Sequence, residues 1–189
     1  TLNLIGAGNI TQTMALTAAT LVVRQTSAIA GNISLNLAND VNFLALNNAA
    51  ASGTASFRDI DDLTISGGPA VTACGVIYAA VNGVTTNNGD VKLTTGGNLM
   101  IGVAADGGVN DISVTQLAGD VITANGLQLL GNGAVNLDDA NNVTTLAASH
   151  TGTISYRDIN ALVVGTVTDS AMAPNTTTSG ITNNADVKL

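Results

Sequence analysis

The octapeptide TNNGDVKL occupies residues 86–93, and the chain writes it again as TNNADVKL at residues 182–189. Asn and Gly adopt turn conformations at low cost, and the Val-x-Leu that follows alternates as a strand with one buried face does. We therefore interpret the first copy as a turn at residues 87–89 that feeds a strand with Val91 and Leu93 pointing inward. The duplication indicates a repeated piece of architecture, and not a catalytic signature.

A longer duplication surrounds this one. SFRDIDDL at residues 56–63 returns as SYRDINAL at residues 155–162, an offset of 99 residues. Other matched segments have slightly different offsets, because small insertions fall in Gly-, Asn- and Ala-rich stretches, as expected for surface turns. We interpret residues 1–103 as a first repeat unit of a continuous solenoid, and residues 104–189 as a second unit that is truncated at its C-terminal end.

A shorter rhythm runs inside each unit. Gly, then Asn or Asp, then an aliphatic residue recurs ahead of alternating apolar positions; these tripeptides begin at Gly8, Gly31, Gly89, Gly97 and Gly119. Short strands that recur about every 20 residues, with no convincing helix between them, are typical of a parallel β-solenoid whose coils stack about 4.8 Å apart. The sequence therefore predicts an all-β solenoid of about nine coils. A β-sandwich also has alternating strands, but it does not require turn tripeptides at this density.

Composition limits the interior and the partners. Hydrophobic residues make up 46% of the chain and aromatic residues 2%, so the core must be built from aliphatic side chains. The net charge is −8 with five basic residues, which argues against a nucleic-acid partner. No run of 18 apolar residues exists, so we expect no membrane insertion. Cys74, the single cysteine, is expected to be a buried or half-buried filler without a redox role.

The repeat style points to a class of protein. The Gly-Asn-Ile turns, Asn-Asp-Val at residues 39–41, GDVKL at 89–93 and GNL at 97–99 resemble the repeat regions of large bacterial exoproteins, namely filamentous-haemagglutinin-like adhesins and autotransporter-type proteins. This resemblance implies a right-handed parallel β-helix with about 20 residues per coil, located at the bacterial cell surface or secreted, and serving as a stalk or extracellular fibre. It implies as partners further repeats of the same larger chain, other copies in a fibre, and a host surface or carbohydrate ligand. Both ends of the sequence fall within strand-like patterns, so we expect an internal segment of a longer chain.

Candidate catalytic groups are few. A nucleophilic triad needs a base, and the only histidine, His150, lies in a turn that we expect to be exposed. Asp59, Asp61 and Asp62 could supply the two acids of a glycosidase, but the second copy retains only Asp158 of the three. We expect these aspartates to lie with their arginines on an exposed face. We therefore predict no enzyme, with no catalytic, cofactor-binding or metal-binding residues; the alternative is a carbohydrate-active or carbohydrate-binding parallel β-helix.

Three further features carry expectations. Residues 106–111 and 138–142 are oxygen-rich turns and candidates for calcium, although neither matches an EF-hand loop or a calcium-binding β-helix repeat. Insertions at residues 67–83 and 165–180 occupy equivalent places in the two units but differ in sequence, so a recognition patch on one flank is a candidate there. Stacked turns can align Asn side chains into amide ladders. The predicted ladder members are Asn32, Asn36, Asn98 and Asn136.

Overall fold

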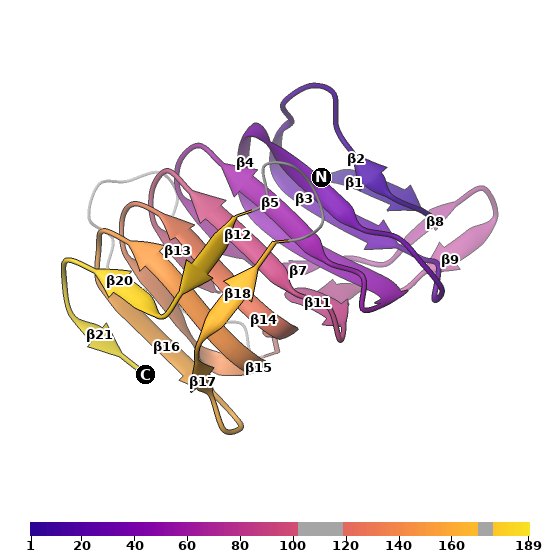
Figure 1. Ribbon diagram of the computed structural model, residues 1–189. Coiled ribbons are helices and arrows are strands. Elements are labelled where there is room, and N and C mark those ends of the chain that lie inside the picture. Colours follow the sequence, from indigo (N-terminus) through magenta and orange to yellow (C-terminus); the bar gives the residue numbers. More distant parts are fainter. Residues whose placement is uncertain (102–118, 170–175) are drawn as a thin grey trace.

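Strands make up all the regular structure of the protein in a computed structural model, which describes residues 1–101, 119–169 and 176–189. Within these ranges the chain forms no helix, so the predicted all-β class is confirmed. Figure 1 shows the strands following one another along the molecule in nearly the order of the sequence, from the indigo N-terminal end to the yellow C-terminal end. The described residues accordingly include no helix of the length and apolarity that a membrane crossing requires.

Fifteen strands form one sheet, and six short strands form three small antiparallel pairs. The strands of the main sheet are β1 (Leu2–Gly6), β2 (Ile10–Thr11), β3 (Thr17–Gln25), β4 (Ile33–Ala51), β5 (Ala55–Asp59), β6 (Leu63–Ile65), β11 (Val84–Asn87), β12 (Val91–Thr95), β13 (Leu99–Ile101), β14 (Ile122–Gly131), β15 (Val135–His150), β16 (Ile154–Asp158), β17 (Val163–Val164), β20 (Ile181–Asn183) and β21 (Val187–Lys188). The small pairs are β7 (Gly67–Gly68) with β10 (Val81–Asn82), β8 (Val71–Ala73) with β9 (Val76–Tyr78), and β18 (Thr166–Thr168) with β19 (Thr177–Ser179).

All neighbouring strands of the main sheet are parallel. Between β1 and β3, β3 and β4, and β14 and β15, where no insertion intervenes, paired residues are 19 to 23 positions apart in the sequence. Leu2 pairs with Leu21, Leu21 with Leu44, and Leu127 with Leu146. One aligned column passes through seven levels: Ile10, Ile33, Ala55, Val91, Leu127, Leu146 and Val164. Within the described residues this column has seven levels against the expected nine or so coils, and the insertion at residues 67–83 adds no level to it.

The aligned strands lie on two faces that share one core. We call the strands in register with Ile33–Leu35 the first face, and those in register with Leu44–Leu46 the second face. The inward side chains of both faces pack into a single aliphatic cluster, in which Leu35, Phe57 and Leu63 are fully buried. Burial of aliphatic surface between the faces is the main stabilising term of such a layered structure.

The repeated turn tripeptide forms a ladder between successive levels. Asn9 Oδ1 accepts a hydrogen bond from the Asn32 N–H at 2.9 Å, and Asn32 Oδ1 accepts one from the Thr54 N–H at 3.0 Å. At another corner, Asn98 Oδ1 accepts from the Ala134 N–H at 2.8 Å in the same way. The predicted ladder thus has a different chemistry at Asn32 and Asn98: each amide bonds to the backbone of the next level, and not to another amide.

Glycine occupies these corners because stacked backbones approach closely. A Cβ built on Gly53 would lie 2.5 Å from the carbonyl oxygen of Gly31, and one on Gly89 would lie 2.1 Å from the carbonyl oxygen of Gly53. Neither Gly53 nor Gly89 has a positive φ. The turn at residues 87–89 obtains its left-handed residue from Asn88 (φ 62°), while Val91 and Leu93 are buried as predicted.

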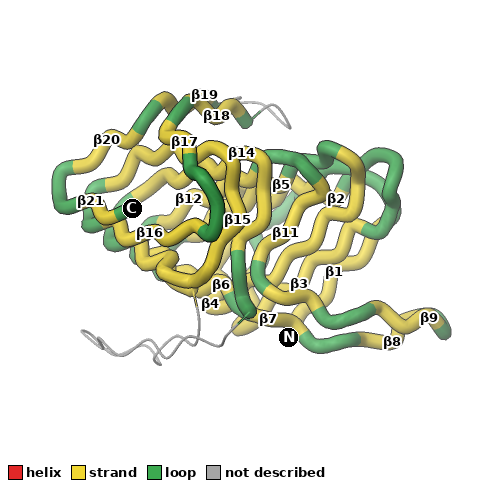
Figure 2. Tube along the Cα trace, turned by 90° about the horizontal axis from the view of Figure 1, so that it is seen from below, coloured by secondary structure: helices red, strands yellow, loops and turns green. Residues whose placement is uncertain are grey.

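Two insertions leave the main sheet in the middle of a strand. On the second face, β4 advances only from Leu44 to Leu46 while its partner advances from Ile65 to Val84. On the first face, β15 advances from Leu146 to Ala148 while its partner advances from Val164 to Ile181. Figure 2 shows the consequence: β7–β9 lie at the lower edge of the molecule and β18–β19 at the upper edge. The prediction that the two insertions form one recognition patch on a single flank is therefore wrong.

Candidate functional site

A row of polar side chains marks the outer surface of the second face. Arg24 on β3 pairs with Asn47 on β4, and Asn47 pairs with Thr85 on β11. Inward residues alternate with outward ones along a strand, and since Val23 and Leu46 are buried in the core, this row points away from it. The row is the floor of the candidate site.

The first insertion covers the neighbouring row and stops at this floor. Val22 and Ala45 are a register pair that lies two residues before Arg24 and Asn47 on the same strands. They form a small buried cluster with Val81 of β10. Gly68 of β7 lies against Val22 so closely that a Cβ on Gly68 would be 2.5 Å from a Val22 methyl group. Apolar outward residues are thus covered by the insertion, and the polar row remains beside its edge.

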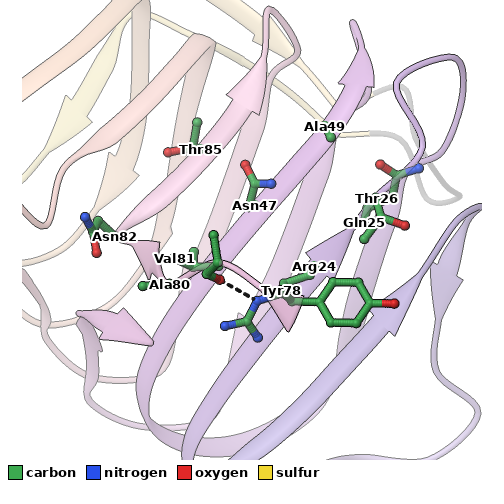
Figure 3. A pocket seen from close by; sticks show the side chains of 11 residues that line it. Arg24, Gln25, Thr26, Asn47, Ala49, Tyr78, Ala80, Val81, Asn82 and Thr85 are labelled. Atoms are coloured by element: carbon green, nitrogen blue, oxygen red, sulfur yellow. Dashed lines mark hydrogen bonds between the residues drawn. The ribbon is translucent and has the colours of Figure 1, made fainter. Parts of the chain in front are cut away.

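A pocket of about 470 Å³ lies between this floor and the insertion. Figure 3 shows side chains that line it, from β3, β4 and β11 on one side and from the segment around β9 and β10 on the other. The polar and aromatic members of the lining include Arg24, Gln25, Asn47, Tyr78, Asn82 and Thr85. The volume falls within the range of ligand pockets, about 300–1,000 Å³.

Arg24 holds both ends of the insertion. Its Nη2 donates to the carbonyl oxygen of Pro69 at 2.5 Å, and its Nε donates to that of Ala79 at 3.2 Å, the dashed bond in Figure 3. Its Nη1 donates to Asn3 Oδ1 at 2.8 Å. Arg24 is only 3% exposed, and burial lowers the pKa of its guanidinium below the usual value. Among the described residues it has no carboxylate partner.

Gln25, the next residue on β3, points to the opposite side of the strand from Arg24 and is in register with the inward Asn48. Its Nε2 donates to the carbonyl oxygen of Ala30 at 3.0 Å, which fixes the orientation of the amide. Its Oε1 is buried and has no hydrogen-bond partner among the described residues. A buried carbonyl oxygen without a donor is unfavourable by about 1–3 kcal/mol, and Thr54, Asp139 and His150 each have a buried atom in the same condition among the described residues.

The second insertion is anchored differently. Lys92, outward on β12 of the first face, contacts Asp169 of the insertion through Nζ and Oδ2 at 2.5 Å. Gln128, beside Lys92 in register, donates to Thr178 Oγ1 at 2.7 Å. Each insertion therefore covers a buried cation, but only the second brings a described carboxylate to it.

His150 is buried, and the prediction of an exposed turn residue is wrong. Its Nδ1 lies 2.9 Å from the carbonyl oxygen of Gly133, and burial lowers the pKa of the imidazole. Asn48 and Asn183 likewise donate to the corner carbonyl oxygens of Gly31 and Gly152. His150 thus belongs to a series of polar side chains that stand at the end of a row of inward-pointing residues. Each of them contacts a backbone carbonyl oxygen of a turn.

The aspartates of the repeated motif are also corner residues. Asp59 is 1% exposed and its Oδ1 accepts from the Val41 N–H at 3.0 Å; Asp158 Oδ2 accepts from the Val143 N–H at 2.9 Å. The expectation of an exposed Arg-Asp face is therefore wrong for Asp59, because its carboxylate closes a buried turn. Burial, followed by a hydrogen bond with Asp61, raises the pKa of Asp59 to about 7. A carboxyl group enclosed in this way is unsuited to reach a saccharide.

Of the two predicted calcium turns, only the one at residues 138–142 lies within the described part of the chain. Residues 106–111 lie outside the described ranges. In the turn at 138–142, Asp138 Oδ1 accepts from Ser155 Oγ at 2.5 Å and Asp139 Oδ1 accepts from the Ala140 N–H at 2.9 Å. No group of three or more His, Cys, Asp or Glu side chains within residues 1–101, 119–169 and 176–189 could hold a metal ion. Cys74 is exposed at the tip of the β8–β9 hairpin, and not buried as expected.

The fold and the pocket together define an all-β repeat protein with parallel strands stacked in register and an insertion that covers a polar row. Comparisons with protein families, with curated proteins and with solved structures give no match to the chain. Function must therefore be argued from the chain's own residues.

Proposed function

We propose that the chain is a right-handed parallel β-helix, with about 20 residues per coil, and that it is a structural repeat segment of a secreted or cell-surface bacterial adhesin or extracellular fibre. The parallel registers of 19 to 23 residues between insertion-free strands support the winding, as in Leu2 with Leu21 and Leu21 with Leu44. The likeness of the turn tripeptides to filamentous-haemagglutinin-like repeats supports the biological setting.

The observation that carries this proposal is how the buried residues are used. Buried aliphatic side chains align from level to level in one continuous core, and buried polar side chains such as Asn39 and Asn141 close corners between levels. Asn39 Nδ2 donates to the carbonyl oxygens of Leu35 and Arg58, while Asn141 Nδ2 donates to those of Leu137 and Arg157. These side chains connect successive levels, which is what an elongated scaffold requires.

A catalytic role receives no comparable support. The aspartates that were candidates for glycoside hydrolysis serve as corner acceptors, and the buried His150 faces a backbone carbonyl oxygen. We propose that the segment has no enzymatic activity, and that its partners are further repeats of the same chain and other copies in a fibre.

Labelling of intact cells tests the location. An antibody raised against the exposed tip of the β8–β9 hairpin should label intact cells of the source bacterium, or detect the protein in the medium, without permeabilisation. An antibody against a cytosolic enzyme is the control and should label only permeabilised cells. Detection of the protein only after permeabilisation would contradict the proposed location.

Electron microscopy of longer segments tests the scaffold. Added repeats should lengthen a rod of constant width by about 4.8 Å per coil, the spacing of hydrogen-bonded strands. Particles that instead widen in all directions with added sequence would contradict a stacked-coil scaffold.

A further inference from the structure

We propose that the pocket beside Arg24 binds an acidic saccharide, with the carboxylate of a hexuronate ring directed at the guanidinium. The inference rests on the pocket's own chemistry and goes beyond the structural role proposed above. Three features carry it: a buried cation without a carboxylate, a set of amide and hydroxyl side chains, and a tyrosine ring.

The cation identifies the charge of the ligand. A guanidinium has five N–H donors, and Arg24 directs three of its bonds to Pro69, Ala79 and Asn3. Those acceptors are neutral, whereas the buried Lys92 under the second insertion has the carboxylate of Asp169 at 2.5 Å. Buried charges in proteins are normally paired, so the pocket next to Arg24 is where an anion would restore the balance. A planar carboxylate suits the guanidinium geometry.

The uncharged side chains identify a saccharide. Asn47, Asn82 and Thr85 each offer both a donor and an acceptor, as sugar hydroxyl groups do. Tyr78, which is half-buried, presents an aromatic ring on which the C–H face of a sugar can lie. The floor of the pocket is a polar row, which does not favour an apolar ligand.

The location also fits recognition. The floor residues Arg24, Asn47 and Thr85 come from three adjacent strands whose positions are fixed by registered hydrogen bonding. The opposite wall belongs to an insertion, whose sequence can vary without altering the stacked core. Rigid strands thus position the charged group, and the insertion determines which saccharide fits.

Titration calorimetry with matched ligands tests the proposal. Trigalacturonic acid is the first probe and a hyaluronan tetrasaccharide the second; the fully methyl-esterified trigalacturonate is the uncharged control for the first. At least one acid should bind, and removal of its charge should weaken binding by about tenfold or more, since one partner of a buried charge pair is lost. Equal binding of ester and acid, or binding of neither acid, would overturn the proposal. Tighter binding of triglutamate would instead assign the pocket to an acidic peptide and would equally overturn it.

Variants that keep Arg24 in place locate the site. Asn47→Asp puts a carboxylate next to Arg24 in register and should weaken binding of the acid by about tenfold or more through repulsion and competition. Asn184→Asp adds the same charge at an exposed position distant in sequence and should leave binding unchanged. Tyr78→Ala should weaken binding of acid and ester alike. Circular dichroism confirms that each variant is folded; an unchanged affinity in folded Asn47→Asp would refute the site, while the cell-surface and rod experiments would be unaffected.

Discussion

Substitution of Gly89 by alanine tests whether the corners are limited by stacking between levels or by the local turn. The methyl group of Gly89→Ala would be placed 2.1 Å from the carbonyl oxygen of Gly53, whereas ordinary contact begins at 3.4 Å. The two levels must therefore separate by about 1.3 Å at this corner. Gly8 heads a tripeptide of the same kind, Gly-Asn-Ile where Gly89 heads Gly-Asp-Val, but a Cβ on Gly8 meets nothing within 4 Å. Gly8→Ala is thus the matched control.

The magnitude follows from the bonds at this corner. The Ser52 N–H donates to the Asn87 carbonyl oxygen at 2.8 Å, and the Ala55 N–H donates to that of Asp90 at 2.9 Å, so both bonds join the two levels that must separate. A displacement of this size stretches both beyond hydrogen-bond range, and each bond contributes about 1 kcal/mol. With some loss of packing around Val91, we expect Gly89→Ala to lower the free energy of unfolding by about 2–3 kcal/mol. Gly8→Ala should change it by less than about 0.5 kcal/mol.

Urea unfolding followed by far-ultraviolet circular dichroism measures both variants against the parent. The slope of the free energy with urea reports whether the unfolding unit is the same in each protein. Equal losses for Gly8→Ala and Gly89→Ala would refute the stacking argument, because the residues would then be needed only for the conformation of the turn itself.

Three further predictions concern the core, a corner and an insertion. Leu63→Asp buries an unpaired charge and should lower the free energy of unfolding by about 4 kcal/mol or more, whereas Ile60→Asp, at a 47% exposed position, should be nearly neutral in the same urea assay; equal effects would place Leu63 outside the core. Because the pKa of Asp59 is raised to about 7 from its ordinary 3.8, the folded state holds the proton more tightly than the unfolded state does. The free energy of unfolding should therefore fall as pH rises from about 4 to about 7. In a pH series of unfolding curves, Asp59→Asn should remove this part of the pH dependence. A slope unchanged by Asp59→Asn would contradict it. Lys92→Met removes the ammonium group that Asp169 faces and should speed limited proteolysis within the second insertion without altering the circular dichroism of the core; an unchanged cleavage rate would contradict the anchoring role.

The sequence predicted the parts of the fold that depend on short-range pattern. Alternation placed Val91 and Leu93 inward, and the Asn-Gly turn lies at residues 87–89, because strand periodicity and turn propensity act locally. It misjudged Asp59 and His150, which were assigned to the surface on the basis of polarity. Their burial depends on backbone N–H and carbonyl groups that only the stacked neighbouring levels supply, and no local pattern encodes those partners.

The candidate site was only partly visible in the sequence. The first insertion was identified as a recognition element, but Arg24 was counted only among the five basic residues. The available signal was Leu21-Val22-Val23-Arg24, in which the inward set of Leu21 and Val23 directs Arg24 outward. Which residues share its row could not be deduced, because Asn47 and Thr85 are 23 and 61 positions further along the chain and align only through parallel registers across an insertion.

The two copies of the repeated sequence motif do not lie on the same face of the structure. Phe57 of the first copy of the motif lies in register with Leu35 on the first face, whereas Tyr156 of the second copy pairs with Leu137. Val135 of that same strand is in register with Leu99, and Leu99 with Leu63, on the second face.

Equivalent motifs therefore close corners on alternate faces. That phase difference explains why the described strands of the two insertions, β7–β10 of the first and β18–β19 of the second, lie over opposite faces. A duplication that returned the chain to the same face would have placed both insertions over that face. The change of face instead separates them, so the pocket of the first insertion and the anchor of the second can differ in sequence without contacting each other.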